Sequence, residues 1–129
     1  MPSPKLRLDG IRQIAVTARD VERAVAFYRD VLELPLLFQA PPGLAFFDCG
    51  GVRLMLSVPE AGELDHPSSI LYFRVADIEQ AHQILIGREV RFEEAPRLLA
   101  RMPDHDLWLA SFRDSEGNIL ALMSEKPRG

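Results

Sequence analysis

The side chains best suited to acid–base chemistry and anion binding are concentrated in residues 95–108, APRLLARMPDHDLW. His105 changes its charge near neutral pH and can act as a general acid or base. Arg97 and Arg101 carry guanidinium groups, which pair with carboxylates or phosphates. The pattern predicts a loop over this stretch that is too long for a simple connection. Loops of this length in a small domain are often functional lids.

Each of these residues also has a purely structural interpretation. His105 stands between Asp104 and Asp106, which is typical of a surface histidine. Trp108, at the expected start of a strand, is typical of an anchor that packs on a core. The Asp-His-Asp triplet is a weak metal signal, because three adjacent residues of a strand cannot all point at one ion. The residues alone leave both interpretations open.

Gln13 is a candidate of a different kind, because it is an amide inside a strand. Apolar residues alternate with others from Ile11 to Thr17, and this predicts a strand with one covered face. A buried amide without a partner costs on the order of 1 to 3 kcal/mol. We therefore expect Gln13 to form a hydrogen bond either with a ligand or with a neighbouring group of the protein.

The first half of the chain predicts one βαβββ unit. A helix begins after Asp20, whose side chain is suited to an N-cap position, and it ends before Pro35, which cannot continue the hydrogen-bond ladder. Apolar residues at helical spacing give this helix one covered side. Short apolar runs separated by turn residues predict the strands. The expected strands are 11–17, 36–39, 44–49 and 52–58.

The second half repeats this order. A helix with Asp77 as its N-cap ends near Gly87, and Asp77 lies 57 residues after Asp20. The segments GGVRLML and EGNILAL also correspond to each other, at a separation of 66 residues. Such self-similarity indicates two copies of one unit, neither of which can cover its own sheet alone. The expected strands are 68–75, 89–94, 107–114 and 118–125.

Four segments in this order resemble the vicinal oxygen chelate superfamily, which includes glyoxalase I, bleomycin resistance proteins and extradiol dioxygenases. The segments are IAVTARDVERAVAFYRDVLELP, FFDCGGVRLML, LYFRVADIEQA and FRDSEGNILALMSE. The resemblance implies a single α+β domain over residues 1–129, with modules at about 11–58 and 68–125 and short flexible tails. It also implies that the two βαβββ modules form a curved mixed sheet, a glyoxalase/bleomycin-resistance-like cup.

In that family four inward-facing strand residues commonly hold a divalent metal. The resemblance places Gln13, Met55, Ile70 and Ala121 at these positions, and the internal repeat relates Gln13 to Ile70 and Met55 to Ala121. Only Gln13 carries an oxygen donor, whereas a divalent cation needs several donors. We therefore predict no metal and no other cofactor. Lewis-acid chemistry then has no physical basis at these positions.

The leading hypothesis is a small-molecule-binding protein of the bleomycin-resistance kind. Strand alternation adds Tyr72 to the ligand face, where its ring can stack and its hydroxyl can meet a polar group. The resemblance also implies a homodimer with pockets between the chains. The residues predicted to bind the ligand are Gln13, Met55, Ile70, Tyr72, Arg97, Arg101, Trp108 and Ala121.

Two alternatives remain open. One is a lyase, isomerase or dioxygenase of the same superfamily, either metal-dependent through displaced ligands such as His105 or Glu125, or metal-free with His105 as the general base. The other is a structural or regulatory dimer whose cup is filled by its own side chains. Each would use the same fold, because a fold does not establish a function.

Composition limits the classes of binding partner and the cellular compartment that we expect for this protein. A net charge of −4 argues against nucleic acid and against anionic membranes, which favour a basic excess. No apolar run approaches the roughly 18 residues that a membrane helix needs, and the first residues lack the apolar core of a signal peptide. The single cysteine, Cys49, agrees with a reducing compartment. We expect a cytoplasmic protein.

Overall fold

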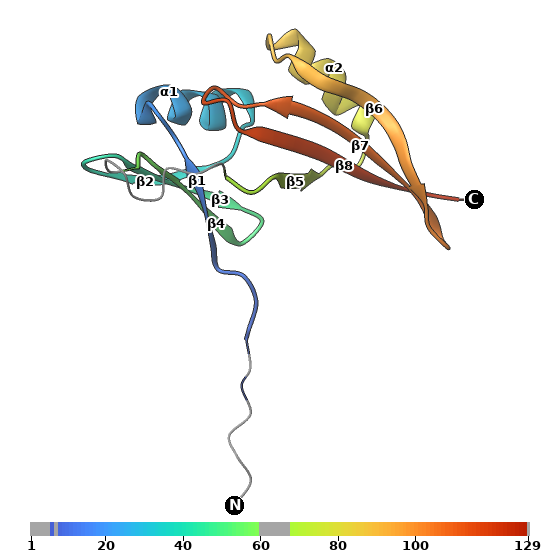
Figure 1. Ribbon diagram of the computed structural model, residues 1–129, viewed down its shortest axis with the longest axis horizontal. Coiled ribbons are helices and arrows are strands. Elements are labelled where there is room, and N and C mark those ends of the chain that lie inside the picture. The colour runs from blue at the N-terminus through green and yellow to red at the C-terminus, as the bar shows by residue number, and fades with distance from the viewer. Residues whose placement is uncertain (1–5, 7, 60–67, 129) are drawn as a thin grey trace, which may run out of the picture.

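Figure 1 shows a computed structural model of the protein, in which residues 6, 8–59 and 68–128 are described. These residues span both predicted modules, while the predicted terminal tails fall partly outside them. The first module consists of β1 (Gln13–Thr17), α1 (Val21–Ala26), the π-helical turn η1 (Phe27–Val31), β2 (Leu36–Ala40), β3 (Leu44–Cys49) and β4 (Val52–Ser57). The second consists of β5 (Leu71–Arg74), α2 (Ile78–Gly87), β6 (Phe92–Arg101), β7 (His105–Arg113) and β8 (Ile119–Pro127).

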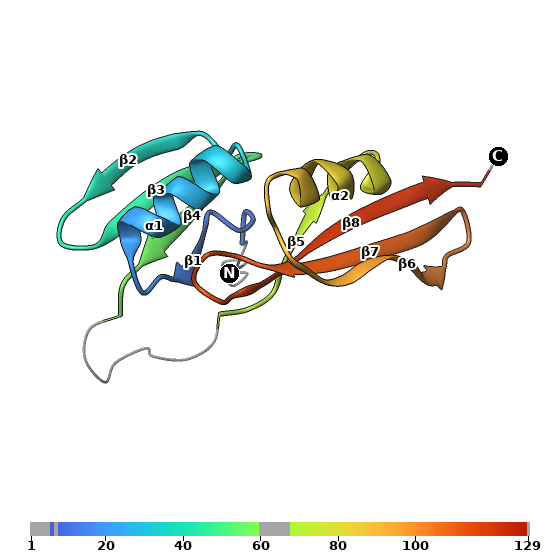
Figure 2. The same ribbon diagram turned by 90° about the horizontal axis from the view of Figure 1, so that it is seen from above.

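The strands form two four-stranded mixed sheets with the same topology, β1-β4-β3-β2 and β5-β8-β7-β6. In each sheet the first strand of the module runs parallel to the last, and the remaining neighbours are antiparallel. The modules lie side by side, with α1 and α2 on the same side of the two sheets (Figures 1 and 2). The expected α+β fold of two βαβββ modules is confirmed.

Local sequence signals set the helix boundaries. The side chain of Asp20 accepts a hydrogen bond from the backbone of Arg23 at 3.1 Å, and that of Asp77 does the same from Gln80 at 3.0 Å. Both predicted N-caps are therefore confirmed. The first helix differs from the expectation at its end, because it widens into η1, where the Leu32 amide bonds to the Phe27 carbonyl at 3.1 Å. Among the described residues, no helix is long and apolar enough to cross a membrane.

The core lies between the helices and the sheet faces beneath them. On the helix side it contains Tyr28 and Ile78, which are fully buried. Alternate residues along the strands face the helices, and they belong to the core or pack against it. They are Ile14, Val16, Leu54, Leu56, Leu71, Phe73 and Val75. The opposite face of each sheet is not covered by the helices and is where a ligand-binding site can lie.

The prediction of a long loop over residues 95–108 is wrong. This stretch forms most of a hairpin, in which β6 runs to Arg101, β7 begins at His105, and only residues 102–104 lie between them. Pro96 lies inside β6, which is the edge strand of its sheet, where proline leaves no ladder bond unmade. The pairing of β6 with β7 also shifts register between Glu94 and Arg97, on either side of the proline.

A buried carboxylate joins the two modules. Glu116, in the turn between β7 and β8, accepts hydrogen bonds from the backbone amides of Arg19 and Asp20 at 2.7 and 2.8 Å, just before α1. It also accepts from Nε and Nη2 of Arg23 at 2.8 and 3.1 Å and from the Ser115 hydroxyl at 2.8 Å. Burial raises the pKa of Glu116, but these hydrogen bonds outweigh it and lower the pKa to about 2.

A second buried carboxylate, Asp114, supports the same junction. It accepts hydrogen bonds from the Tyr28 hydroxyl at 2.7 Å and from the backbone amides of Glu116 and Asn118, each at 2.8 Å. The Asn118 side chain donates to Asp114 at 2.9 Å and to the carbonyl of Thr17 in β1 at 2.8 Å. The β7–β8 turn is therefore fixed to the first module at several points, and this sets how the two sheets are placed.

Candidate functional site

The exposed face of the second sheet carries a pocket of about 460 Å³. Four of the predicted ligand-binding residues line it: Ile70 and Tyr72 at β5, Ala121 on β8, and Arg97 on β6. They meet there because Tyr72 and Ala121 are register partners in neighbouring parallel strands. Tyr72 is 53% exposed, so a large part of its ring is available to a ligand.

The pocket combines an apolar floor with a charged rim. Arg97 Nε donates to a Glu94 carboxylate oxygen at 2.7 Å, and Arg113 Nε donates to Glu93 at the same distance. All four side chains are about half exposed, and ion pairs of this kind contribute little to stability. Either arginine can therefore exchange its carboxylate partner for an anionic group of a ligand at small cost.

Several lining residues were not predicted from the sequence. Leu109, Ser111 and Arg113 alternate along β7 and face the pocket together with Leu99 of β6. The alternation of β7 was a usable signal, because Ser111 is the register partner of Ala121. Leu99 could not be assigned to a sheet face, because residues 95–108 were predicted to form a loop and not a strand.

Gln13 lies on the exposed face of the first sheet, and its partners come from within the protein. Its oxygen accepts a hydrogen bond from Arg53 Nε at 2.7 Å, and its amide nitrogen lies 3.7 Å from the sulfur of Met55. The guanidinium of Arg53 also lies over the ring of Phe46, 5.5 Å from its centroid. Phe46 in turn stacks on Phe38 at 4.5 Å. This face thus carries an aromatic and apolar patch with one amide–guanidinium pair.

The four family positions do not fit a divalent metal. The oxygen of Gln13 already accepts from a guanidinium, whose positive charge repels a cation, and Met55, Ile70 and Ala121 have no oxygen or nitrogen donor in their side chains. Elsewhere in the described part of the chain, no three His, Cys, Asp or Glu side chains form a metal-binding group. Gln13 and Met55 belong to the first sheet, whereas the pocket with Ile70 and Ala121 is lined by the second module alone.

The other predicted site residues lie away from this pocket. His105 Nδ1 is 2.7 Å from Asp104, and its Nε2 is 3.2 Å from Glu125, at the far end of the β7–β8 ladder. Arg101 is exposed at the end of β6. Trp108 faces the helix side of the sheet, where it packs against the core and Lys126 Nζ lies 4.3 Å from its ring.

Cys49 is half-buried, and this burial, together with Asp48, raises the pKa of its thiol. A thiol whose pKa is raised carries less thiolate at neutral pH and is a weaker nucleophile. The interpretation of Cys49 as a small packing residue agrees with this setting.

Two βαβββ modules with exposed, partly apolar sheet faces define a glyoxalase-like α+β protein. The model of the Glyoxalase/Bleomycin resistance protein/Dioxygenase superfamily matches residues 10–122, and the chain belongs to this superfamily. The comparison with curated proteins found no match.

Solved structures show the same fold. A lactoylglutathione lyase from Agrobacterium tumefaciens is 24% identical with a TM-score of 0.72, and the match covers 91% of this chain and 94% of that one. A superfamily member from Sphaerobacter thermophilus is 20% identical with a TM-score of 0.78, covering 93% and 100%. A virulence protein from Salmonella typhimurium is 17% identical with a TM-score of 0.75, covering 92% and 98%. At these identities the likeness concerns the fold alone.

Proposed function

We propose that the chain is a small-molecule-binding protein that uses the exposed sheet faces without a metal. The observation that carries this proposal is the pocket on the second sheet, where Tyr72, Ile70 and Ala121 offer apolar and aromatic surface beside the Arg97–Glu94 pair. Concave sites of this size, with an apolar lining and a few polar groups at the edge, are typical of small-ligand sites. A ligand with an apolar body and one anionic or hydrogen-bonding group suits this lining.

We also propose that the working form is a homodimer. β1 and β5 are edge strands, and Ile70 and Tyr72 at β5 are 44% and 53% exposed. On the first sheet Phe38, in the other edge strand β2, is 49% exposed. Apolar side chains exposed on neighbouring strands mark interaction surfaces. If the first sheet of one protomer faced the second sheet of the other, Gln13 would border the same cavity as Ile70, and the site would be complete only in the dimer.

Tyr72→Ala tests the ligand site. A library of small organic acids and neutral aromatics is screened by thermal shift, and the affinity of each hit is measured by calorimetry. Loss of a stacking ring at the centre of a site weakens binding by about tenfold or more. Ile86→Ala, at a similarly exposed position on α2, is the control and should not change affinity. Hits that bind both variants like the unmodified protein would contradict the proposed site.

Two further parts of the proposal, binding without a metal and the homodimer, are tested by separate measurements. Titration with zinc or nickel should give no tight stoichiometric binding and no large rise in melting temperature, since a metal that binds the folded state stabilises it by mass action. Sedimentation should report twice the mass of one chain. Tight metal binding would refute the first part of the proposal, and a monomer at high concentration would refute the second.

An enzyme of the same superfamily is the second candidate. His105 favours it, because one ring nitrogen lies 2.7 Å from Asp104 and a carboxylate in that position can orient a general base. One structural neighbour is a lactoylglutathione lyase. If any turnover is found, His105→Ala should abolish it without unfolding the protein. An unchanged rate would remove His105 from the mechanism.

A further inference from the structure

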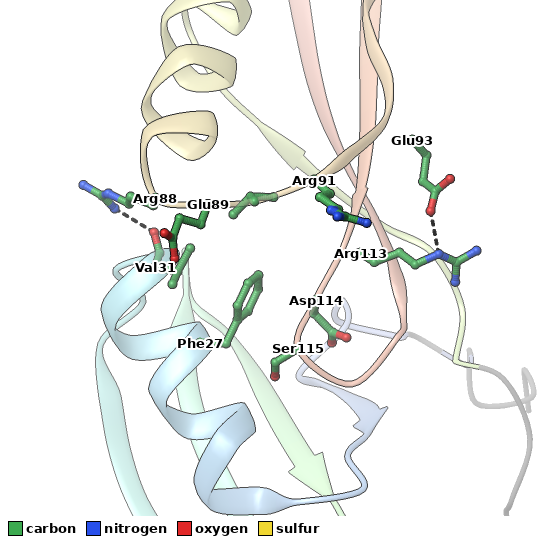
Figure 3. A pocket seen from close by; sticks show the side chains of 10 residues that line it. Phe27, Val31, Arg88, Glu89, Arg91, Glu93, Arg113, Asp114 and Ser115 are labelled. Carbon is green, nitrogen blue, oxygen red and sulfur yellow. Dashed lines mark hydrogen bonds and ion pairs between the residues drawn. The ribbon is translucent and has the colours of Figure 1, made fainter.

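A second pocket, of about 520 Å³, lies between the two modules. It differs in this from the first pocket, which lies on the exposed face of the second sheet. Figure 3 shows the side chains around it. Phe27 and Val31 come from η1, residues 88–91 come from the connection between α2 and β6, and Ser115 comes from the β7–β8 turn. A molecule held here would therefore touch both modules at once.

Two of the arginines that border this pocket are already paired. Arg88 donates to the Val31 carbonyl at 2.6 Å and forms an ion pair with Glu33 at 3.0 Å. Arg113 donates to Glu93 and to the Gly117 carbonyl, each at 2.7 Å. An anionic ligand would have to displace a carboxylate partner from either of them, Glu33 from Arg88 or Glu93 from Arg113.

Arg91 differs from both. Within the part of the chain that the structure describes, its guanidinium makes no hydrogen bond and no ion pair, and Figure 3 shows it extending into the pocket toward the Arg113 side. Arginine presents several N–H donors in a planar fork that matches a carboxylate. Arg91 can therefore pair with an anionic group without first displacing a partner. The carboxylate of Asp114, which also lines the pocket, is already held by the Tyr28 hydroxyl and by the backbone amides of Glu116 and Asn118.

Most of the residues that line this pocket are polar, and its apolar part is formed by three residues, of which Phe27 is the largest. Figure 3 shows the ring of Phe27 at the opening between the helix and the β7–β8 turn. Phe27 begins the π turn, and such widened turns occur frequently at functional sites. Val31 and Val90 add further apolar surface.

Glu89 limits where a negative charge can lie. Figure 3 places its carboxylate beside Val31, on the opposite side of the pocket from Arg113. Its backbone has a φ of +67°, because Glu89 occupies the left-handed position that ends α2, where its N–H bonds to the Ile86 carbonyl at 3.0 Å. An anionic group is therefore directed to the Arg91 side, and the apolar body of the ligand to the Phe27 side.

We propose that this pocket binds a small monocarboxylate with an aromatic or apolar body, with its carboxylate on Arg91 and its apolar part on Phe27. The site is separate from the proposed function, although Arg113 and Glu93 border both pockets. Arg91 borders only this one, which makes it the residue to change.

The test is a titration of isotope-labelled protein with phenylacetate, followed by NMR. Saturable shifts are expected at Phe27, Val31 and Ser115. Arg91→Gln should weaken binding by about tenfold or more, the effect of losing a charge-assisted hydrogen bond. Arg19→Gln removes the same charge at an exposed position outside the pocket and should bind normally. The neutral amide, phenylacetamide, should bind the unmodified protein about as weakly as phenylacetate binds Arg91→Gln.

Three results would overturn the proposal. They are equal affinity of phenylacetate for the unmodified protein and for Arg91→Gln, shifts confined to the face that carries Tyr72, and no saturable shift at millimolar concentration. The spectrum of Arg91→Gln without ligand verifies its fold, which should be intact because Arg91 is exposed. Tyr72→Ala should leave phenylacetate binding unchanged, so failure of this inference and failure of the proposed function give different results.

Discussion

Replacement of Glu116 by glutamine tests the junction between the modules. The carboxylate accepts five hydrogen bonds from Arg19, Asp20, Arg23 and Ser115, and its side chain is only 1% exposed. Glutamine keeps one acceptor oxygen but turns an amide N–H group toward donors and removes the charge that Arg23 faces. A buried donor or charge that loses its partner lowers the stability of the folded protein strongly.

The pKa of Glu116 gives the size of the effect. It is lowered from the ordinary 4.5 to about 2 in the folded protein. Because each pKa unit corresponds to about 1.4 kcal/mol, the ionised carboxylate contributes about 3 kcal/mol to the free energy of unfolding. For a chain of 129 residues this corresponds to a melting temperature about 10 °C lower in Glu116→Gln at neutral pH.

The pH dependence has a definite sign. A carboxyl group whose pKa is lower in the folded state stabilises the protein fully above its unfolded pKa, here 4.5, and progressively less as the pH falls toward about 2. The difference in stability between the unmodified protein and Glu116→Gln should therefore be largest near neutral pH and shrink through this window. Urea unfolding at several pH values, followed by circular dichroism, measures it.

Asp30→Asn is the matched control. Asp30 forms an arginine–carboxylate pair with Arg29 at 2.8 Å, but both side chains are more than half exposed. Removal of an exposed pair costs about 1 kcal/mol or less. If Glu116→Gln is no more destabilising than Asp30→Asn, or if its effect is the same near pH 3 and at neutral pH, the buried carboxylate is not the link between the modules.

Three further changes test other parts of the fold. Tyr28→Phe removes the 2.7 Å hydrogen bond to Asp114 and should reduce the free energy of unfolding by about 1 to 2 kcal/mol, measured by urea titration, since Asp114 keeps its other donors. Asp77→Ala removes the N-cap bond to Gln80 and should cost about 1 kcal/mol, with faster amide exchange confined to the start of α2. Glu89→Gly relieves a positive φ of +67° and should raise stability by about 0.5 to 1 kcal/mol in calorimetry; a loss would show that the Glu89 side chain is needed for folding.

Periodicity and turn chemistry predicted most of the fold. Asp20 and Asp77 begin helices as expected, and the alternation from Ile11 to Thr17 predicted a strand with one covered face, on which Val16 is buried. The loop predicted over residues 95–108 is instead strand and hairpin, and the strand β6 accommodates Pro96 because β6 is an edge strand. Whether a strand lies at the edge of a sheet depends on the arrangement of all the strands, so a short stretch of sequence does not reveal it.

The site was only partly predictable for a similar reason. Tyr72 and Ala121 could be placed on one face, because parallel pairing within a module follows from the repeat. The pairing of Gln13 with Arg53 depends on the register of β1 with β4. The pocket beside Arg91 depends on how the modules are placed relative to each other, and no local pattern carries that information.

The Glu116 junction also has a consequence for biosynthesis. The amides at the beginning of α1 receive their acceptor from a residue 96 or 97 positions further along the chain. While the first module emerges from the ribosome, these amides have only water as a partner, and the carboxylate arrives only after a further 96 or 97 residues have been made. A first module made without the second should therefore hold its helix poorly, and the two modules should acquire their final structure together once the β7–β8 turn has been made.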